Sequence, residues 1–217
     1  MAKLFIICGH CAGDPGAIGN GYEEAERVRT LAAKIKEFGG DNVIIGDTTK
    51  NWYKSKMVNN TNIPKGSLVL ELHMDSSASP SAKGAHVIID ANLDADKYDT
   101  ALAKFITGIF PGRSQTLVKR NDLANGNRAQ KAGINYRLVE CGFISNANDV
   151  QMFHVKMDEI AKGILKSFGF DVVNKPVAVT GKGLYRVQVG AFSSKANAEK
   201  LMNELKAKGY NAFIKKD

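Results

Sequence analysis

Short apolar segments alternate with longer amphipathic segments over residues 1–171, and this alternation is the strongest constraint on the fold. The apolar segments predict five buried strands, over residues 3–8, 42–47, 67–73, 85–90 and 136–143. Apolar residues at helical spacing predict helices over residues 23–38, 94–110 and 149–168, with a short helix near 50–59. Strands that alternate with helices form a sheet covered by helices. The sequence therefore predicts an α/β fold with a mixed, largely parallel sheet flanked by helices.

The pattern changes at the end of this first domain. We expect a linker over residues 172–182, because this stretch lacks periodicity and contains a proline and a glycine. Residues 183–217 then predict a strand, a helix and a strand, with Ser194 as the helix N-cap and Gly209 at the C-terminal end of the helix. The sequence thus predicts a small C-terminal α+β unit of the βαβ type, present once, after a larger domain over residues 1–171.

The formal net charge of +8 is concentrated toward the C-terminal part of the chain, where residues 181–217 contain eight basic and three acidic side chains. Such a segment suits an anionic polymer, either nucleic acid, anionic lipid or cell wall, and a solvated lysine surface explains the charge equally well. The early apolar run from Leu4 to Cys8 is too short for the core of a signal peptide, and no stretch is long enough to span a membrane. We therefore expect a chain made in the cytoplasm without a signal peptide and without membrane insertion.

Residues with metal-binding side chains stand at the ends of predicted strands. His10 follows the first strand, His73 closes the third, and Glu140 lies near the end of the last. The carboxyl ends of parallel strands meet at one edge of a sheet, where ligands bind. Glu24 lies in the first turn of the first predicted helix, and the glycine-rich loop before it allows the backbone to bring it back beside His10. Together these residues suggest a catalytic zinc site with three protein ligands and one position for water.

Each of these residues also has a structural explanation. A histidine at a strand end is commonly a capped or surface residue, and Glu24 at a helix start could simply favour the helix dipole. Glu140 is harder to explain in this way, because it interrupts an apolar strand and an unpaired buried carboxylate is costly. Position alone leaves the metal site and the structural roles about equally open.

Three segments resemble the signature blocks of a known enzyme family. These segments are GHCAGDPGAIGNGYEE, LELHMDSS with GAHVII behind it, and LVECGFISNANDVQMF. In this order they resemble the zinc-dependent N-acetylmuramoyl-L-alanine amidases of the Amidase_3 type, which occur in bacterial autolysins and phage endolysins. The resemblance implies zinc ligands at His10, Glu24 and His73 and an acid/base role for Glu140. Glu23 competes with Glu24 for the second ligand position, and the family's Gly-x-x-Glu spacing favours Glu24.

Two features depart from the family pattern. Cys11 stands where the family commonly has glycine, and the third block lacks a proline often seen in it. Cys11 is interpreted as a thiol beside the site without a metal role, with metal ligation as the alternative. Three cysteines argue against a disulfide scaffold, so Cys8 and Cys141 are expected to be small core residues. His86 and His154 are assigned to structure.

The C-terminal segment resembles one half of a SPOR repeat, a module associated with peptidoglycan binding. The resemblance rests on YRVQVGAFSSKANAEKLMNELKAKGYNAFIKKD. A full module has two βαβ halves, and the first strand of each half fills a gap in the other, so two copies of this chain could complete one sheet. We therefore expect peptidoglycan rather than nucleic acid as the partner, and a homodimer formed through residues 183–217.

The resemblance implies a peptidoglycan hydrolase that cleaves the amide bond between N-acetylmuramic acid and L-alanine of the stem peptide, with Zn²⁺ as the cofactor. A zinc peptidase that acts within the stem peptide is an alternative reaction for the same site. A non-catalytic peptidoglycan-binding adaptor is an alternative from a different functional class. Without a signal peptide, the protein is expected to reach the cell wall after release by phage or mother-cell lysis.

Overall fold

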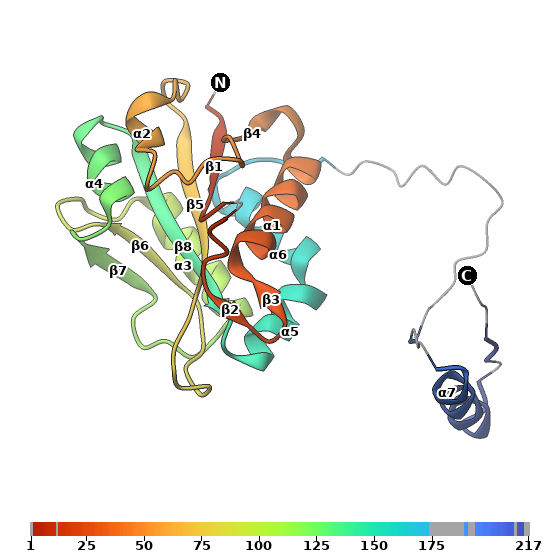
Figure 1. Ribbon diagram of the computed structural model, residues 1–217. Coiled ribbons are helices and arrows are strands. Elements are labelled where there is room, and N and C mark those ends of the chain that lie inside the picture. Colours follow the sequence, from red (N-terminus) through yellow and green to blue (C-terminus); the bar gives the residue numbers. More distant parts are fainter. Residues whose placement is uncertain (1, 12, 174–188, 191–193, 211, 215–217) are drawn as a thin grey trace. The chain divides into compact units, whose positions relative to one another are not determined.

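The computed structural model describes residues 2–11, 13–173, 189–190, 194–210 and 212–214. The chain divides into two compact units, with the boundary between Lys175 and Pro176. Figure 1 shows a sheet covered by helices in the larger unit and a helix in the smaller one.

The larger unit is built around a six-stranded sheet with the strand order β4-β1-β5-β8-β6-β7. The strands are β1 (Leu4–Cys8), β4 (Val43–Ile45), β5 (Leu68–Asp75), β6 (His86–Asp90), β7 (Leu117–Arg120) and β8 (Asn135–Phe143). Neighbouring strands are parallel except for β6 and β8, which are antiparallel. The predicted mixed, largely parallel sheet is therefore confirmed.

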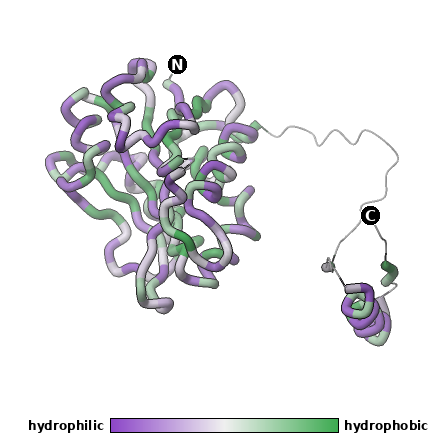
Figure 2. Tube along the Cα trace, viewed as in Figure 1, coloured by the Kyte–Doolittle hydropathy of each residue, from purple (hydrophilic) through white to green (hydrophobic). Residues whose placement is uncertain are grey.

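Helices cover both faces of this sheet (Figure 1). One face carries α1 (Glu24–Gly39), α3 (Lys97–Ile109), α5 (Ala147–Val155) and α6 (Met157–Ser167), which pack on it through the larger hydrophobic core. The other face carries α2 (Met57–Asn60) and α4 (Ala124–Lys131) over a smaller core. Figure 2 shows the apolar residues gathered along the strands between these layers. Glu71 and His73 of β5 and Glu140 of β8 lie on this second face of the sheet.

Short elements complete the larger unit. A two-residue hairpin, β2 (Ile18–Gly19) and β3 (Tyr22–Glu23), stands between β1 and α1. A 3-10 turn, η1 (Gly40–Asn42), joins α1 to β4. No helix in the part of the chain that the structure describes is long and apolar enough to cross a membrane.

The sequence prediction differs from the structure at several places in the larger unit. The helix predicted over 149–168 is two helices, α5 and α6, which meet at Lys156 with a non-helical backbone conformation. β7 and α4 were not predicted at all. α4 has the sequence ANGNRAQK, whose asparagines and glycine are poor helix formers and whose few apolar residues form no stripe. Its place is set by contacts with β8 rather than by local propensity.

The smaller unit contains the predicted helix as α7 (Lys195–Ala207). Ser194 occupies the N-cap, although its side chain accepts no capping hydrogen bond, and Gly209 follows the helix with φ +86°. The first predicted strand, over 184–192, lies outside the described residues except for Val189 and Gly190. Within the second, over 210–216, the described residues do not form a strand, which needs a hydrogen-bonded neighbour.

A buried ion pair ties the sheet to α3. Arg137 of β8 is 1% exposed, and its Nε donates to Asp99 Oδ1 over 2.7 Å. Its Nη2 donates to Asp96 Oδ2 over 3.1 Å. Asp96 and Asp99 also form the capping box at the start of α3. Because Asp99 is itself buried, the guanidinium is the group that compensates its charge inside the protein.

We predict that Arg137→Ala lowers the free energy of unfolding by about 3–5 kcal/mol, because it leaves a buried carboxylate without its partner. Urea unfolding followed by circular dichroism measures this change. Lys119→Ala serves as the control, since Lys119 pairs with the exposed Asp94 and such surface pairs contribute about 0–1 kcal/mol. Equal destabilisation by the two variants would contradict the prediction.

Candidate metal centre

The four residues singled out in the sequence lie at one edge of the sheet. His10 follows the end of β1 by two residues, and Glu24 is the first residue of α1. His73 in β5 stands directly opposite Glu140 in β8 in the parallel register. The rings of His10 and His73 lie edge to face, with their centroids 5.2 Å apart. The carboxyl ends of β1, β5 and β8 therefore bring two histidines and two glutamates together.

Glu24 lies between the two histidines. Its Oε2 is 3.2 Å from His10 Nε2, and its Oε1 is 2.8 Å from His73 Nδ1. The backbone amides of Ala17 and Met74 each donate to the same carboxylate over 3.1 Å. Burial alone would raise the pKa of Glu24, but the hydrogen bonds and charges of the two histidines hold that pKa far below its usual range. Glu24 is therefore an anion held rigidly at the centre of the cluster.

His10, Glu24 and His73 form a group that could hold a metal ion. Each offers one ligand atom, and these atoms all lie within 4.8 Å of one another. Two imidazole nitrogens and one carboxylate oxygen are a donor set that proteins use for catalytic zinc, with further positions left to water or substrate. Glu23, the rival for the second position, is exposed on the hairpin and is not in this group.

Two glycines make room for the cluster. A Cβ atom on Gly16 would lie 2.6 Å from His10 Cδ2 and 2.7 Å from Glu24 Oε2. A Cβ atom on Gly9 would lie 2.4 Å from His73 Cε1. The loop must also reverse, and His10 itself has a φ of +56°. The glycine-rich loop therefore permits a close approach of backbone to the cluster as well as a sharp turn.

Glu140 differs from Glu24 in its surroundings. Its Oε2 atom is buried and has no hydrogen-bond partner among the described residues. Burial raises the pKa of Glu140 to about 7, although the neighbouring His73 opposes this change. A carboxyl group with this pKa can both accept and donate a proton near neutral pH. On its other side Glu140 stands opposite His86 of β6, whose pKa is lowered to about 4, mainly by burial.

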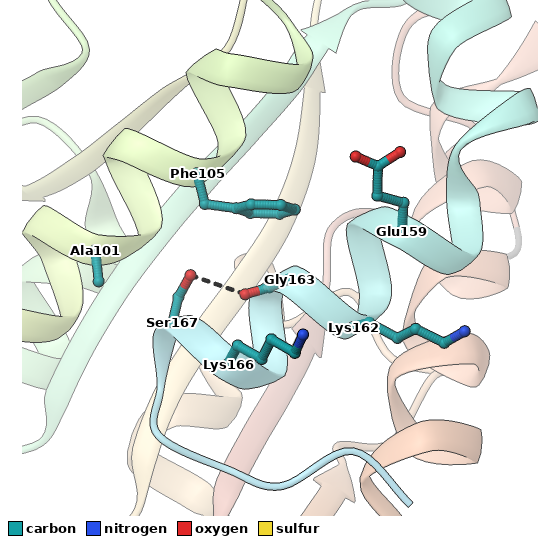
Figure 3. A pocket seen from close by; sticks show the side chains of 7 residues that line it. All are labelled: Ala101, Phe105, Glu159, Lys162, Gly163, Lys166 and Ser167. Carbon is teal, nitrogen blue, oxygen red and sulfur yellow. Dashed lines mark hydrogen bonds between the residues drawn. The ribbon is translucent and has the colours of Figure 1, made fainter. Parts of the chain in front are cut away.

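The cluster opens into a cavity of about 250 Å³ on the face of the sheet that carries α2 and α4. Its lining includes His10, His73 and Glu140 together with Trp52, Tyr53 and Asn125. A larger hollow, of about 680 Å³, lies between α3 and α6, and Figure 3 shows that Phe105 lies across Gly163 there. Its lining contains no histidine or cysteine and none of the residues of the cluster. The smaller cavity is therefore the candidate active site.

A family model matches most of this chain. The model of the N-acetylmuramoyl-L-alanine amidases matches residues 4–168. The chain belongs to this amidase family. The model of the SPOR domain matches residues 159–216.

Among curated relatives of the amidase family, a probable autolysin from Staphylococcus aureus is 31% identical over 219 residues. That match covers 91% of this chain and 42% of the autolysin, so the chain spans less than half of that relative. A sporulation-specific N-acetylmuramoyl-L-alanine amidase from Bacillus subtilis is 25% identical, with 99% of this chain and 84% of the relative covered.

Solved amidase-family structures share the fold. The CwlD amidase from Clostridioides difficile, solved with the GerS lipoprotein, matches with a TM-score of 0.62 and 17% identity, over 77% of this chain and 96% of that one. The catalytic domain of the CD27L endolysin, which targets Clostridia difficile, also matches with a TM-score of 0.62 and 24% identity. This match covers 79% of this chain and 99% of the endolysin domain. These likenesses support the α/β architecture of the larger unit.

The cysteines of this amidase-family chain separate into two kinds. Cys8 and Cys141 are buried in the larger core, where burial raises the pKa of both thiols. Cys11 lies in the loop, where its backbone pairs with Asp14. It does not belong to the group of metal-binding atoms found among the described residues.

Sequence reasoning missed two carboxylates that contact the histidines. Asp14 Oδ1 is 3.3 Å from His10 Nδ1, and Glu71 Oε1 is 3.0 Å from His73 Nε2. Glu71 could have been found from the sequence, because residues two apart in a strand lie on the same face and Glu71 precedes His73 by two. Asp14 carried no such signal, since its position depends on the course of the loop.

We predict that Gly16→Ala loses bound metal whereas Gly13→Ala retains it. Both glycines have a positive φ, so both variants carry a similar backbone cost of about 1–2 kcal/mol. Only at Gly16 does the added methyl group meet His10 and Glu24, because a Cβ at Gly13 would have no atom of the described residues within 4 Å beyond its chain neighbours. Elemental analysis of dialysed protein gives the metal ions per chain. Equal metal content in the two variants would show that the cluster tolerates the methyl group.

Proposed function

We propose that this chain is an N-acetylmuramoyl-L-alanine amidase that hydrolyses the amide bond between the lactyl group of N-acetylmuramic acid and L-alanine in peptidoglycan. The observation that carries the proposal is the group of His10, Glu24 and His73 beside Glu140, in a chain that belongs to the amidase family. The names of the relatives and structural neighbours support the same reaction. A zinc peptidase acting within the stem peptide is the rival reaction for this site.

In this proposal His10, Glu24 and His73 hold Zn²⁺ through His10 Nε2, the Glu24 carboxylate and His73 Nδ1. The donor set and the space left by Gly9 and Gly16 support this assignment. When bound, the ion lowers the pKa of a coordinated water toward ~7 and polarises the carbonyl group of the scissile amide.

Glu140 supplies the proton transfers. Its carboxylate takes a proton from the attacking water, and the resulting carboxyl group donates that proton to the departing amide nitrogen. The donation is necessary because an amide anion is a poor leaving group. The raised pKa of Glu140, about 7, allows the same side chain to serve in both steps.

We predict that Glu140→Gln abolishes hydrolysis while the protein keeps about one metal ion per chain, because this residue moves protons and does not bind metal. His73→Ala should instead lose the ion, since a three-ligand site has no spare donor. Elemental analysis and loss of turbidity of purified cell walls measure the two properties. Loss of metal from Glu140→Gln, or a fully metallated and active His73→Ala, would contradict these assignments.

Mass analysis of soluble products from defined peptidoglycan separates the candidate functions. The proposed amidase releases stem peptides with a free N-terminal L-alanine. A zinc peptidase would release shorter peptides and leave L-alanine on the muramic acid. A non-catalytic adaptor would release nothing.

We further propose that residues 1–171 form the catalytic domain, residues 172–182 the linker, and residues 183–217 a SPOR-like unit that binds peptidoglycan. The SPOR match begins at residue 159, inside α6. However, α6 buries Ile160, Ala161 and Ile164 completely within the larger core. α6 is thus already part of the catalytic unit, so we assign only residues 183–217 to the SPOR-like unit.

The small unit has apolar surface that favours pairing with a second copy. None of the residues of α7 is buried. Val189, Tyr210 and Phe213 are 61%, 64% and 74% exposed. Because one half unit is too small to hold a core, we propose that two chains associate through residues 183–217.

We predict that the full chain is a dimer at micromolar concentration and that a truncation ending at Asn174 is a monomer. Multi-angle light scattering measures the mass of each. The truncation should still digest dispersed peptidoglycan, because it keeps the whole catalytic unit. A monomeric full chain, or a truncation that still dimerises, would contradict the pairing.

A further inference from the structure

Glu71 holds the metal-facing histidine of β5 from the side away from Glu24. It is 5% exposed, and its Oε1 is 3.0 Å from His73 Nε2. The other ring nitrogen, Nδ1, is 2.8 Å from Glu24 Oε1. The imidazole of His73 is therefore held between two carboxylates, of which only Glu24 belongs to the group of metal-binding atoms.

Glu71 is itself fixed by neighbours from two other elements. The hydroxyl group of Tyr136 in β8 donates to Glu71 Oε2 over 2.7 Å, and Asn125 Nδ2 in α4 donates to the same oxygen over 3.0 Å. Arg128 donates to Asn125 Oδ1 over 2.8 Å, which orients the Asn125 amide so that its NH₂ group faces Glu71. The carboxylate is thus locked in place, with its charge compensated by donors.

We infer that Glu71 is a positioning residue that fixes the tautomer and orientation of His73, so that Nδ1 faces the metal. A neutral imidazole carries one N–H group and one lone pair. When Nε2–H donates to Glu71, the lone pair is on Nδ1, the nitrogen beside Glu24. A carboxylate in this position also makes the ring a stronger ligand. The inference rests on the metal site proposed above.

The same arrangement is looser at His10. Asp14 Oδ1 lies 3.3 Å from His10 Nδ1, the nitrogen away from Glu24. The Asp14 carboxylate also accepts hydrogen bonds from Asn51 and Lys54, and its side chain is 23% exposed. Glu71, which is buried and nearer to its histidine, therefore has the larger influence on the site.

The inference is tested first on the unaltered protein. Two-bond ¹H–¹⁵N correlation spectra of the Zn²⁺-loaded chain, labelled at the histidine nitrogens, report which nitrogen of His73 carries the proton. Resonance assignment through the side-chain carbon atoms of His73 identifies its signals, so the metal site needs no substitution. The inference requires the proton on Nε2. A proton on Nδ1 would overturn it without any change to Glu71.

Glu71→Gln then measures the contribution to metal binding. We expect the Kd for Zn²⁺, from competition with a chromophoric chelator, to rise about 10–100-fold, the usual effect of losing such a carboxylate. Glu71→Asp keeps the charge but shortens the side chain by one methylene group, so it should weaken binding as well. The control is Glu23→Gln, which removes an exposed negative charge beside Glu24 and should leave the Kd unchanged.

Circular dichroism and urea unfolding establish that each variant is folded. If Glu71→Gln is unfolded, Glu71→Asp and the tautomer of the unaltered protein decide the question. Folded variants with unchanged Kd would overturn the inference while leaving the amidase proposal intact. By contrast, an unaltered protein that binds no Zn²⁺ or releases no peptides with N-terminal L-alanine would refute the proposed function itself.

Discussion

The contact on which the rest of the site depends is the carboxylate of Glu24 between His10 and His73. It joins three segments that are far apart in the sequence: the loop after β1, the start of α1 and the end of β5. For Glu24 to reach both rings, the chain must reverse and return between Cys8 and Glu24. That requirement accounts for the left-handed backbone at His10 and for the absence of a side chain at Gly9 and Gly16.

The charge distribution around the two histidines favours a bound cation. Glu24 and Glu71 are buried, and Asp14 is partly buried. Glu140 has a buried oxygen that no residue in the described part of the chain hydrogen-bonds. Collecting carboxylates in a low-dielectric cavity is unfavourable unless positive charge compensates them. In the absence of a metal, the carboxylates raise the pKa of His10 and His73, even though burial lowers it. A divalent ion would supply that charge and leave both rings neutral, as metal ligands must be.

Much of this arrangement could be predicted from the sequence, because it follows from local patterns. Apolar segments such as LFIIC and LVLEL predict the strands of the sheet. Because ligands bind at the carboxyl ends of parallel strands, the positions of His10, His73 and Glu140 predict that these residues lie close together. What could not be predicted depends on contacts distant in sequence. α4 has weak helix propensity, yet it supplies Asn125 to Glu71 and Arg128 to the backbone carbonyl of Tyr53. The apolar residues of α5 and α6 continue one helical pattern, so the sequence predicts a single helix and gives no sign of the break at Lys156.

X-ray absorption at the zinc edge tests the central claim most directly, because it reports the atoms bound to the metal. For ligation by His10, Glu24 and His73 we expect only nitrogen and oxygen neighbours, at about 2.0–2.2 Å, with the multiple scattering of two imidazole rings. A sulfur neighbour at about 2.3 Å would place Cys11 on the metal and contradict the account.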